Sequence, residues 1–425
     1  MGAFLSAFAV FLVAGVPIVV VLGLAALAYV VFNDQMHLIA AFPQRMIAGV
    51  DQFVLLTVPL FILAGNLMNA GSITEKIICF CQVLVGRFRG GLAMVNVLSS
   101  MLFAGVSGSA TADSAALGSV LVPGMKKAGY DAEYAAALTS VSSVIGPIIP
   151  PSIQMIVFAV LSGTSVAGLF LAGIVPGILI GVGLMLHAVW VAHKRNYPRE
   201  KASGSSEILN AAMGAWPALM LPVIILGGIL SGVFTPTEAA AVASLYALFI
   251  SAVVYRSLTW RSLVSVLYDT SVISSVILLV VSMASIISFV FSIEQIPEQV
   301  AEAMFSISEN KYVILAMITV GLLVLGALME PIGALILVVP VLLEVGELIG
   351  LDPLHLGVIV VMNLVIGLAT PPIGLCLFIV CSIAKLPIEK VARASLPQLG
   401  ICLLVLVLIT LVPDLVLFLP RYFNF

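Results

Sequence analysis

The sequence predicts an all-α polytopic membrane protein, and three observations lead to this fold class. Hydrophobic residues make up 62% of the 425 residues and charged residues only 9%, against about 25% charged residues in soluble domains. Apolar stretches long enough to cross a bilayer follow one another almost from end to end. No stretch alternates polar and apolar residues over the length that a membrane β-strand requires.

The apolar segments are expected to form helices in chain order. The first, 3–31, has no Lys or Arg before Arg45 and is predicted to be a retained span rather than a signal peptide. Two segments, 92–122 and 312–343, are too long for one span and too short for two, so each is expected to hold a span and a re-entrant hairpin. The pattern Thr-Pro-Thr-Glu ending at Glu238 predicts a capped helix start. The full set of segments is 3–31, 52–70, 92–122, 132–161, 167–192, 215–231, 238–255, 271–293, 312–343, 355–383 and 396–420.

Other features of the composition disfavour several classes of protein. The five cysteines lie in apolar segments without a C-x-x-C pair, so neither a zinc site nor a disulfide framework is indicated. With a net charge of −3 and basic residues scattered among loops, the sequence does not indicate a basic surface for binding a nucleic acid. No Gly-Lys pair occurs, so the phosphate-binding loop of an ATP-driven pump is missing.

Two parts of the chain repeat each other at a shift of 221 residues. Gly105 to Pro176 aligns without a gap onto Gly326 to Pro397, with 11 identities in 72 positions. The matches include Gly and Pro, which determine backbone shape rather than bulk. Internal repeats of this kind are typical of secondary transporter folds.

A single polar stretch separates the two halves. Residues 193–207 carry two Lys and two Arg within nine residues, so the positive-inside rule places this connecting loop in the cytoplasm. The segments 1–192 and 208–425 are then expected to be inverted repeats, because an odd number of crossings in each half inverts one relative to the other. Both termini are expected to lie in the periplasm.

Each repeat carries a double proline in the middle of an apolar segment. The sequences GPIIPPS from Gly146 and GLATPPIG from Gly367 are predicted to break a helix at the membrane midplane. Because proline lacks an N–H, Pro150 is expected to free the carbonyl of Gly146 and Pro371 that of Gly367. Such carbonyls are suitable ligands for sodium. A simple kink is the alternative, and two breaks at matching repeat positions favour the ion site.

A candidate hairpin tip precedes each break. The first, GVSGSATADS from Gly105, contains Ser109 and Asp113, and the second, GALMEPIG from Gly326, contains Glu330 at the position equivalent to Ser109. Close helix packing explains the small residues but no carboxylate. Ionisable groups within a membrane are costly, so Asp113 and Glu330 are functional candidates. For Asp113, capping of a hairpin helix is an equally good explanation.

At these motifs the sequence resembles the large membrane subunit of the TRAP transporters, the tripartite ATP-independent periplasmic family. The resemblance covers essentially the whole chain and rests on GVSGSATAD, MKKAGYDAEYAAALT, SSVIGPIIPPS, GVFTPTEAAAVA and GLATPPIG. It implies an elevator-type ion-transporter architecture, in which two hairpins and two broken helices move against a fixed scaffold. It also implies sodium-coupled secondary uptake of an organic acid across the bacterial inner membrane, with sialic acid as the first expectation, and no enzymatic activity.

The resemblance further implies partners, coupling ions and site residues. The partners are a small four-helix membrane subunit and a periplasmic substrate-binding protein that delivers a carboxylate substrate. At least two sodium ions are implied, one at Ser107, Gly146, Ile149 and Pro151, and one at the repeat-related Gly326, Gly367, Thr370 and Ile373. Substrate is expected near Ser109, Gln154 and Glu330. These pocket residues include no Arg or Lys, so an anion would rely on helix dipoles, hydroxyls and bound sodium.

Two other classes of protein rank below a transporter. An intramembrane serine protease would use Ser107, which lies in a G-x-S-G sequence, together with His187 as its base. A lone histidine in an apolar span is more often a packing residue, and the motif is common in chains rich in Ser and Gly. An ion channel is disfavoured because paired breaks with covering hairpins suit alternating access rather than a continuous filter.

Overall fold

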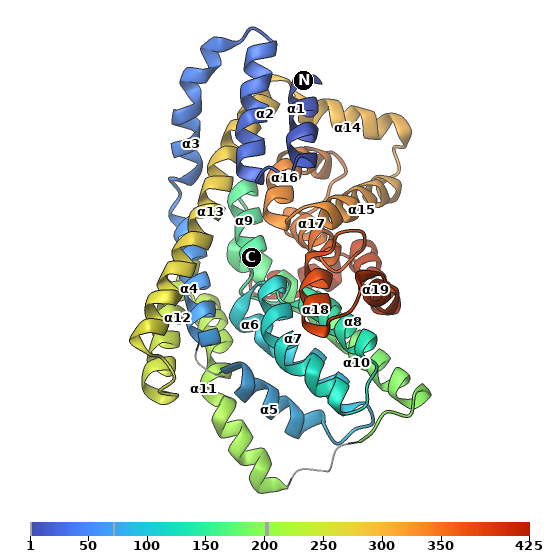
Figure 1. Cartoon of the computed structure of the whole chain (residues 1–425). Coiled ribbons are helices and arrows are strands. Elements are labelled where there is room, and N and C mark those ends of the chain that lie inside the picture. The colour runs from blue at the N-terminus through green and yellow to red at the C-terminus, as the bar shows by residue number, and fades with distance from the viewer. Residues whose placement is uncertain (1, 71–72, 200–203) are drawn as a thin grey trace.

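A computed structural model describes residues 2–70, 73–199 and 204–425 of the chain. Within these ranges the chain forms helices joined by short turns, without a β-strand (Figure 1). Eight of the described helices are long and apolar enough to cross a membrane. The prediction of an all-α polytopic protein is therefore confirmed.

The helices of the first half run from the N-terminus to the connecting loop. They are α1 (Gly2–Val13), α2 (Ile18–Phe32), α3 (Phe42–Val50), α4 (Thr57–Ala70), α5 (Ile73–Val85), α6 (Gly91–Ser107), α7 (Ala110–Lys127), α8 (Ala132–Ser142), α9 (Ile153–Ser162) and α10 (Val166–Lys194). Short 3₁₀ turns add Met36–Ala41, Phe53–Leu56 and Ser143–Ile145.

The helices of the second half follow the connecting loop. They are α11 (Ser205–Leu230), α12 (Pro236–Phe249), α13 (Trp260–Ile293), α14 (Ile296–Ile307), α15 (Lys311–Leu328), α16 (Pro331–Leu348), α17 (Pro353–Gly367), α18 (Leu375–Ala384), α19 (Ile388–Leu411) and α20 (Asp414–Tyr422). A π-helical turn, Ile250–Val254, extends α12.

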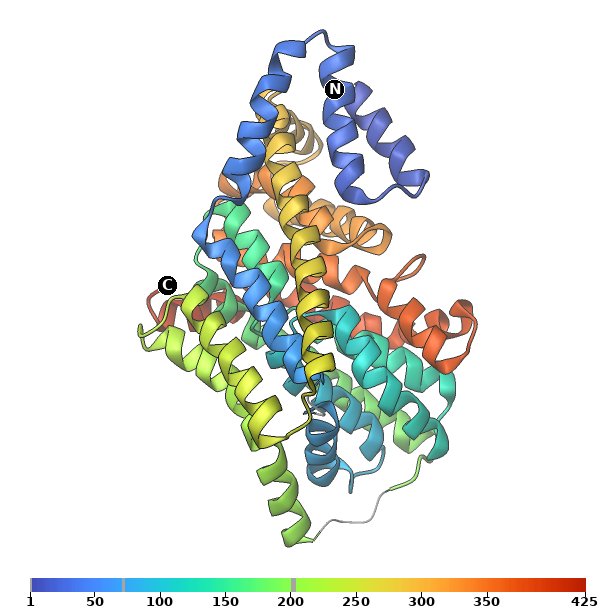
Figure 2. The same cartoon turned by 60° about the vertical axis from the view of Figure 1, so that its left-hand side comes forward.

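The N-terminal apolar run does not form the single span that the sequence predicts. It divides into α1 and α2, which pack against each other as a pair (Figure 2). Gly15, with a φ of +75°, and Pro17 lie in the turn between them. Glycine adopts this left-handed backbone without the steric cost of a Cβ, so two residues break a run that is apolar throughout.

The two long segments that are expected to contain hairpins each form two helices. Gly108 and Ser109 join α6 to α7, and Met329 and Glu330 join α15 to α16. Each of these turns provides the N-cap of the helix that follows, Ser109 for α7 and Glu330 for α16. Each segment thus forms one helical hairpin with its tip at the expected position, without the additional span that the sequence predicts beside it. The re-entrant character of the hairpins stays a prediction.

Both double prolines interrupt helices, as predicted. The first interruption, residues 146–152, separates α8 and its 3₁₀ turn from α9, and the second, residues 368–374, separates α17 from α18. Each contains a cis peptide bond, before Pro151 and before Pro372 respectively. The order of a helical hairpin, a broken helix and a long helix thus occurs twice, in α6–α10 and α15–α19. The division into inverted repeats at 1–192 and 208–425 stays a prediction.

The predicted capped start of α12 is confirmed. Thr235 accepts a hydrogen bond from the backbone N–H of Glu238, at 3.3 Å, and the Glu238 carboxylate accepts one from the N–H of Thr235, at 2.8 Å. This reciprocal pairing is a capping box. Glu238 therefore has a structural role.

Helix α13 is the longest of the described helices and runs along one side of the molecule like a wall. Its 34 residues correspond to about 51 Å at the usual helical rise. Helices α3 and α4 pack along it on one side, as Figure 2 shows, and α16 also contacts it. Helices α1, α2, α3 and α14 gather at one end of the molecule, and the ends of α10 and α11 next to the connecting loop lie at the other (Figure 1).

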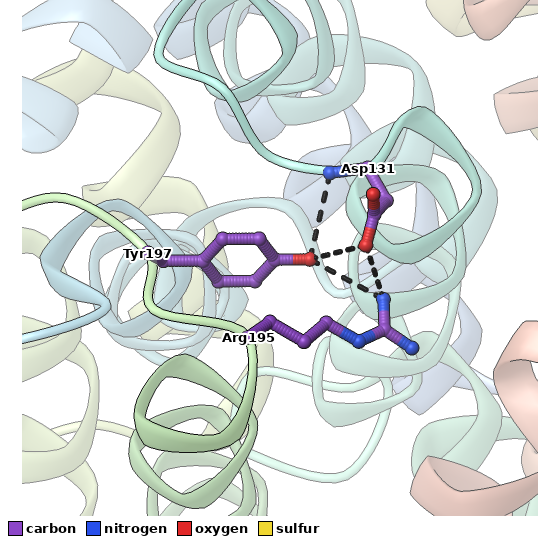
Figure 3. Close-up of polar contacts among 3 residues, drawn as sticks. All are labelled: Asp131, Arg195 and Tyr197. Atoms are coloured by element: carbon purple, nitrogen blue, oxygen red, sulfur yellow. Dashed lines mark hydrogen bonds and ion pairs between the residues drawn. The ribbon is translucent and has the colours of Figure 1, made fainter.

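The described part of the connecting loop is fixed to the start of α8. Tyr197 donates a hydrogen bond to Asp131, at 2.7 Å, and Arg195 forms an ion pair with the same carboxylate (Figure 3). Burial and the hydrogen bond to Asp131 raise the pKa of Tyr197, so its hydroxyl remains a donor well above neutral pH. Residues 200–203 of the predicted loop lie outside the described residues.

Asp131 and its repeat equivalent Asp352 have different partners. Asp352 caps α17 by accepting hydrogen bonds from the N–H groups of Leu354 and His355, at 2.8 and 3.4 Å. Asp131 occupies the N-cap position of α8 without a side-chain cap. The same residue at equivalent positions thus stabilises a helix end in one repeat and holds the connecting loop in the other.

Candidate functional site

A cavity of about 600 Å³ lies where the two hairpin tips meet the start of α9 and the wall formed by α13. All three predicted substrate residues, Ser109, Gln154 and Glu330, line it. They come from three separate elements of the chain, the first tip, α9 and the second tip. The structure therefore brings the predicted substrate residues together.

The hairpin tips present helix N-termini to this cavity. The Glu330 carboxylate accepts hydrogen bonds from the N–H groups of Ile332 and Gly333, at 2.9 and 3.2 Å. Ser109 accepts one from the N–H of Ala112, at 3.4 Å. The N-termini of α7 and α16 carry the positive ends of their helix dipoles, which favour anions.

Gln154 lies in the first turn of α9 and has an unused hydrogen-bonding group. Its side-chain carbonyl oxygen is buried and has no partner within the described part of the chain. Buried polar groups are normally paired, so an unpaired one that borders a cavity is available to a ligand. No Arg or Lys lies among the residues that line the cavity, and Glu330 is their single charged member.

Two members of the predicted first ion set, Ser107 and Gly146, lie against one buried carboxylate, that of Asp113. The Ser107 hydroxyl donates a hydrogen bond to Asp113 Oδ1, and the N–H of Ser109 reaches the Ser107 oxygen at 3.3 Å. Asp113 Oδ2 is buried and has no partner among the described residues. This oxygen faces Gly146 so closely that a Cβ at that glycine would lie 2.4 Å from it.

The first hairpin tip also touches the break itself. A Cβ on Gly108 would lie 2.5 Å from the carbonyl oxygen of Pro151. The structure thus gathers Ser107, Gly146 and Pro151 of the predicted ion set around the tip. Ile149 belongs to the same interruption, with its side chain packed against Gly177 of α10.

Asp113 lies beside Ser107 and Gly146 but is not a member of the predicted first ion set. Sequence reasoning selects it as a functional candidate, with helix capping as the alternative. Ser109 caps α7 instead, and Asp113 lies one turn further along with one oxygen unpaired. The signal that identifies it is a carboxylate within an apolar region, six residues after Ser107.

The residues of the second predicted ion set are brought together mainly by close contacts between backbone atoms. A Cβ on Gly367 would lie 2.2 Å from the carbonyl carbon of Gly326, so the second tip rests directly on α17. Thr370 is next to this contact, and its hydroxyl donates to the carbonyl of Ile366 at 2.8 Å. Ile373 lies further along the interruption and is 39% exposed.

One expectation about this second break is wrong. The carbonyl of Gly367 is not freed by Pro371, because it accepts a hydrogen bond from the N–H of Thr370 at 2.9 Å. The chain tightens into a three-residue turn at this point, which replaces the bond that proline removes. A carbonyl oxygen has two lone pairs, so one acceptor position of Gly367 remains.

The two ion sets differ in charge. Under the repeat shift of 221 residues, Ala334 is equivalent to Asp113 and Leu328 to Ser107. The first set therefore has a carboxylate beside it that the second set lacks, while each set contains one hydroxyl, that of Ser107 or that of Thr370. Among the described residues no cluster of three or more His, Cys, Asp or Glu side chains could hold a metal ion.

The arrangement does not favour the protease alternative. Ser107 donates its hydrogen bond to Asp113. The His187 ring lies beside those of Tyr134 and Trp190, with centroid distances of 6.4 and 6.0 Å. The hydrogen bonds of the described residues include none between Ser107 and His187, which nucleophilic catalysis would require.

Proteins of known structure share the fold. The chain is similar to the Alcanivorax borkumensis YdaH transporter, whose crystal structure reveals an unusual topology, with a TM-score of 0.64 at 15% sequence identity over 89% of this chain and 88% of that one. It is also similar to MtrF of Neisseria gonorrhoeae, with a TM-score of 0.62 at 11% identity over 90% and 85% of the two chains. At such low identity the likeness concerns the fold alone.

Relatives with much higher identity align over nearly the whole chain. The sialic acid TRAP transporter large permease protein SiaM of Vibrio cholerae is 40% identical over 97% of this chain and 96% of its own length. The 2,3-diketo-L-gulonate TRAP transporter large permease protein YiaN of Escherichia coli is 38% identical over 96% of both chains. The isethionate TRAP transporter permease protein DctMQ of Oleidesulfovibrio alaskensis is 38% identical, and this chain covers 65% of its length.

The family model of the tripartite ATP-independent periplasmic transporter, DctM component, matches residues 5–415. This match spans both hairpins, both broken helices and the α13 wall. The large permeases of this family work in organic acid uptake with a substrate-binding protein and a small membrane subunit. The chain belongs to the DctM family of TRAP transporter large permease proteins.

Proposed function

We propose that this permease couples the entry of sodium ions to the uptake of an organic acid. The observation that carries the proposal is the buried Asp113 carboxylate, with one oxygen unpaired and directed at the Gly146 break. An uncompensated carboxylate inside a membrane protein costs several kcal/mol. A small cation held by Asp113, Ser107 and the carbonyls around Gly146 would remove this cost, and hard oxygen ligands suit sodium.

A second sodium ion is proposed at Gly326, Gly367 and Thr370. This set offers backbone carbonyls and one hydroxyl without a carboxylate, so it should bind its ion more weakly than the first. Because each set joins a hairpin tip to a broken helix, a bound ion would hold the tip closed over the substrate. Substrate and sodium would then bind cooperatively.

The substrate is proposed to be a carboxylate with several hydroxyl groups, with sialic acid as the leading candidate. Ser109, Gln154 and the Glu330 carboxylate are partners suited to hydroxyl groups. The cavity lacks a basic side chain, and the Glu330 carboxylate already occupies the N-terminus of α16, so the N-terminus of α7 and the nearby sodium ions would balance the substrate carboxylate. The relative that transports sialic acid supports this choice.

An elevator movement is proposed because the cavity lies against an apolar wall. The side chains that α13 contributes to the cavity are Val272, Ile273, Val276, Ile277 and Val280. A wall of aliphatic side chains makes no hydrogen bonds to the groups that face it. The hairpins and broken helices could therefore slide along α13 without breaking polar contacts at this surface.

The central test is uptake by the complete three-part system. We expect proteoliposomes that contain the permease, its small subunit and the binding protein to take up labelled sialic acid only with an inward sodium gradient. The dependence on sodium should be cooperative, since two ions are proposed. Equal uptake from potassium would refute sodium coupling, and non-saturating flux would favour a channel. His187→Ala should leave uptake unchanged, because a transporter, unlike a serine protease, needs no histidine base.

Orientation in the membrane is tested by labelling of single cysteines. We expect Asn196→Cys, in a Cys79→Ser background, to be protected from an impermeant thiol reagent in intact cells and to react in inverted vesicles, because its loop should be cytoplasmic. Glu309→Cys, between α14 and α15 at the opposite end, should show the reverse. Labelling of Asn196→Cys from the periplasm would overturn the orientation, including the periplasmic position of both termini.

A further inference from the structure

A second cavity, of about 390 Å³, follows the substrate cavity along the same two helices. The substrate cavity reaches Gln154 at the start of α9 and Val280 on α13. The second cavity continues with Val160 near the end of α9 and with Val281 on α13. On α9, seven residue steps separate Ile153, which also lines the substrate cavity, from Val160, and they correspond to about 10 Å.

This outer cavity lies towards the end of the molecule that carries α1 to α3 and α14. Helix α3 provides part of its lining, and the last turns of α13 provide another part. In Figure 1 this region lies opposite the end that holds the connecting loop. In the proposed orientation, the outer cavity is on the periplasmic side of the substrate cavity.

The outer cavity differs from the substrate cavity in charge. Its single ionisable lining residue is Arg45, which is exposed and lies on α3. Ser285, Ser288 and Ser292 of α13 also line it. Their spacing places three hydroxyls along one face of the helix. A cation surrounded by hydroxyls suits an anion, whereas the single charged group of the substrate cavity is the acidic Glu330.

Arg45 has a fixed position beside α13. Its guanidinium lies 4.5 Å from the centroid of the Phe289 ring. Ser282 donates a hydrogen bond to the carbonyl of Met46, at 3.0 Å, which holds α3 against α13. The ion pairs found within the described residues do not include Arg45. A guanidinium stacked on an aromatic ring keeps its N–H groups available for an anion.

We propose that Arg45, with Ser288 and its neighbouring hydroxyls, forms an outer subsite for the carboxylate of the substrate. The subsite would receive the anion after its release from the binding protein, before it passes between α9 and α13 to the inner cavity. This inference rests on the proposed function. Arg45 and the serines belong to α3 and the α13 wall, so they would remain in place while α9 moves.

A chemical probe tests the charge of the subsite without transport. Ser288→Cys in a Cys79→Ser background is treated with an anionic reagent, sulfonatoethyl methanethiosulfonate, and with a cationic one, trimethylammonioethyl methanethiosulfonate. We expect Arg45→Gln to lower the ratio of the anionic to the cationic rate about tenfold, because one positive charge beside the thiol is lost. Arg45→Lys should keep most of the ratio. Arg261→Gln, at the other end of α13, is the matched control and should change nothing.

Transport provides the second readout. In the full complex, Arg45→Gln should raise the concentration of loaded binding protein needed for half-maximal sialic acid uptake about three- to tenfold, with little loss of maximal rate. Arg45→Lys and Arg261→Gln should stay close to wild type. An unchanged rate ratio in Arg45→Gln overturns the subsite even if sodium-driven uptake is normal. Loss of sodium dependence in the wild type would refute the proposed coupling, but it would not affect the conclusion from the thiol-labelling rates about the outer subsite.

Discussion

Asp113→Asn is expected to abolish sodium-driven uptake while the protein still reaches the membrane and folds. The substitution keeps the shape of the side chain and its contact with Ser107, and removes the negative charge that faces Gly146. Loss of one partner of a buried charge pair costs about 3–5 kcal/mol. Since 1.4 kcal/mol is a factor of ten, sodium affinity at the first site should fall about a hundredfold or more.

Folding and ion binding are separated by a thermal measurement. Sodium should raise the melting temperature of the wild-type complex, because a ligand that binds only the folded state stabilises it. Asp113→Asn should lose this rise, and without sodium it should be at least as stable as wild type, because an unpaired buried charge has been removed. Asp269→Asn removes an exposed carboxylate from α13 and is the matched control. A wild-type sodium response in Asp113→Asn would exclude Asp113 as a ligand.

The repeat and the breaks could be predicted because they depend on local backbone chemistry. Proline removes a donor wherever it lies, and two double prolines at one repeat shift identify both interruptions. The same rule fails at the Gly367 carbonyl. The rule accounts for the hydrogen bond that proline removes, but not for the tighter turn in which the N–H of Thr370 donates to this carbonyl instead. Hydrophobicity alone likewise misses the turn at Gly15, since the run around it is apolar on both sides.

The remaining differences come from contacts between distant parts of the chain. Whether Ser109 or Asp113 caps α7 depends on how the tip packs against the break at Gly146. The role inferred for Arg45 depends on α3 lying against Phe289, which is 244 residues further along the chain. In the sequence, Arg45 is only the first basic residue of an apolar region. Such pairings require the tertiary structure.

Gly367→Ala is expected to cause the largest loss of folded protein among single methyl additions at the two breaks. The new Cβ would lie 2.2 Å from the carbonyl carbon of Gly326 and 2.6 Å from the nitrogen of Ala327. Both are backbone atoms, so the second hairpin tip would have to move away from α17. Overpacking of a well-packed interior typically costs 1–3 kcal/mol and occasionally more, and a backbone clash belongs at the upper end of that range.

This geometry changes what alanine substitutions can reveal about the ion sites. If the two glycines only kinked their helices, an added methyl would be tolerated, but at Gly367 the clash predicts a loss whether or not an ion binds. At Gly146 the new Cβ would instead meet the Asp113 carboxylate at 2.4 Å. Ser107→Ala and Thr370→Ala remove hydroxyls without adding bulk, so their sodium dependence separates binding from packing.

The matched control for Gly367→Ala is Gly321→Ala, in the first helix of the same hairpin. A Cβ at Gly321 would meet no atom within 4 Å, and alanine favours a helix over glycine by about 1 kcal/mol. Gly321→Ala should therefore keep or slightly raise the melting temperature, whereas Gly367→Ala should lower it by several degrees or prevent accumulation in the membrane. Equal melting temperatures in the two variants would mean that the second tip does not rest on Gly367. The proposed closure of that tip by sodium would then lose its structural basis, because no fixed contact would join the hairpin to the broken helix.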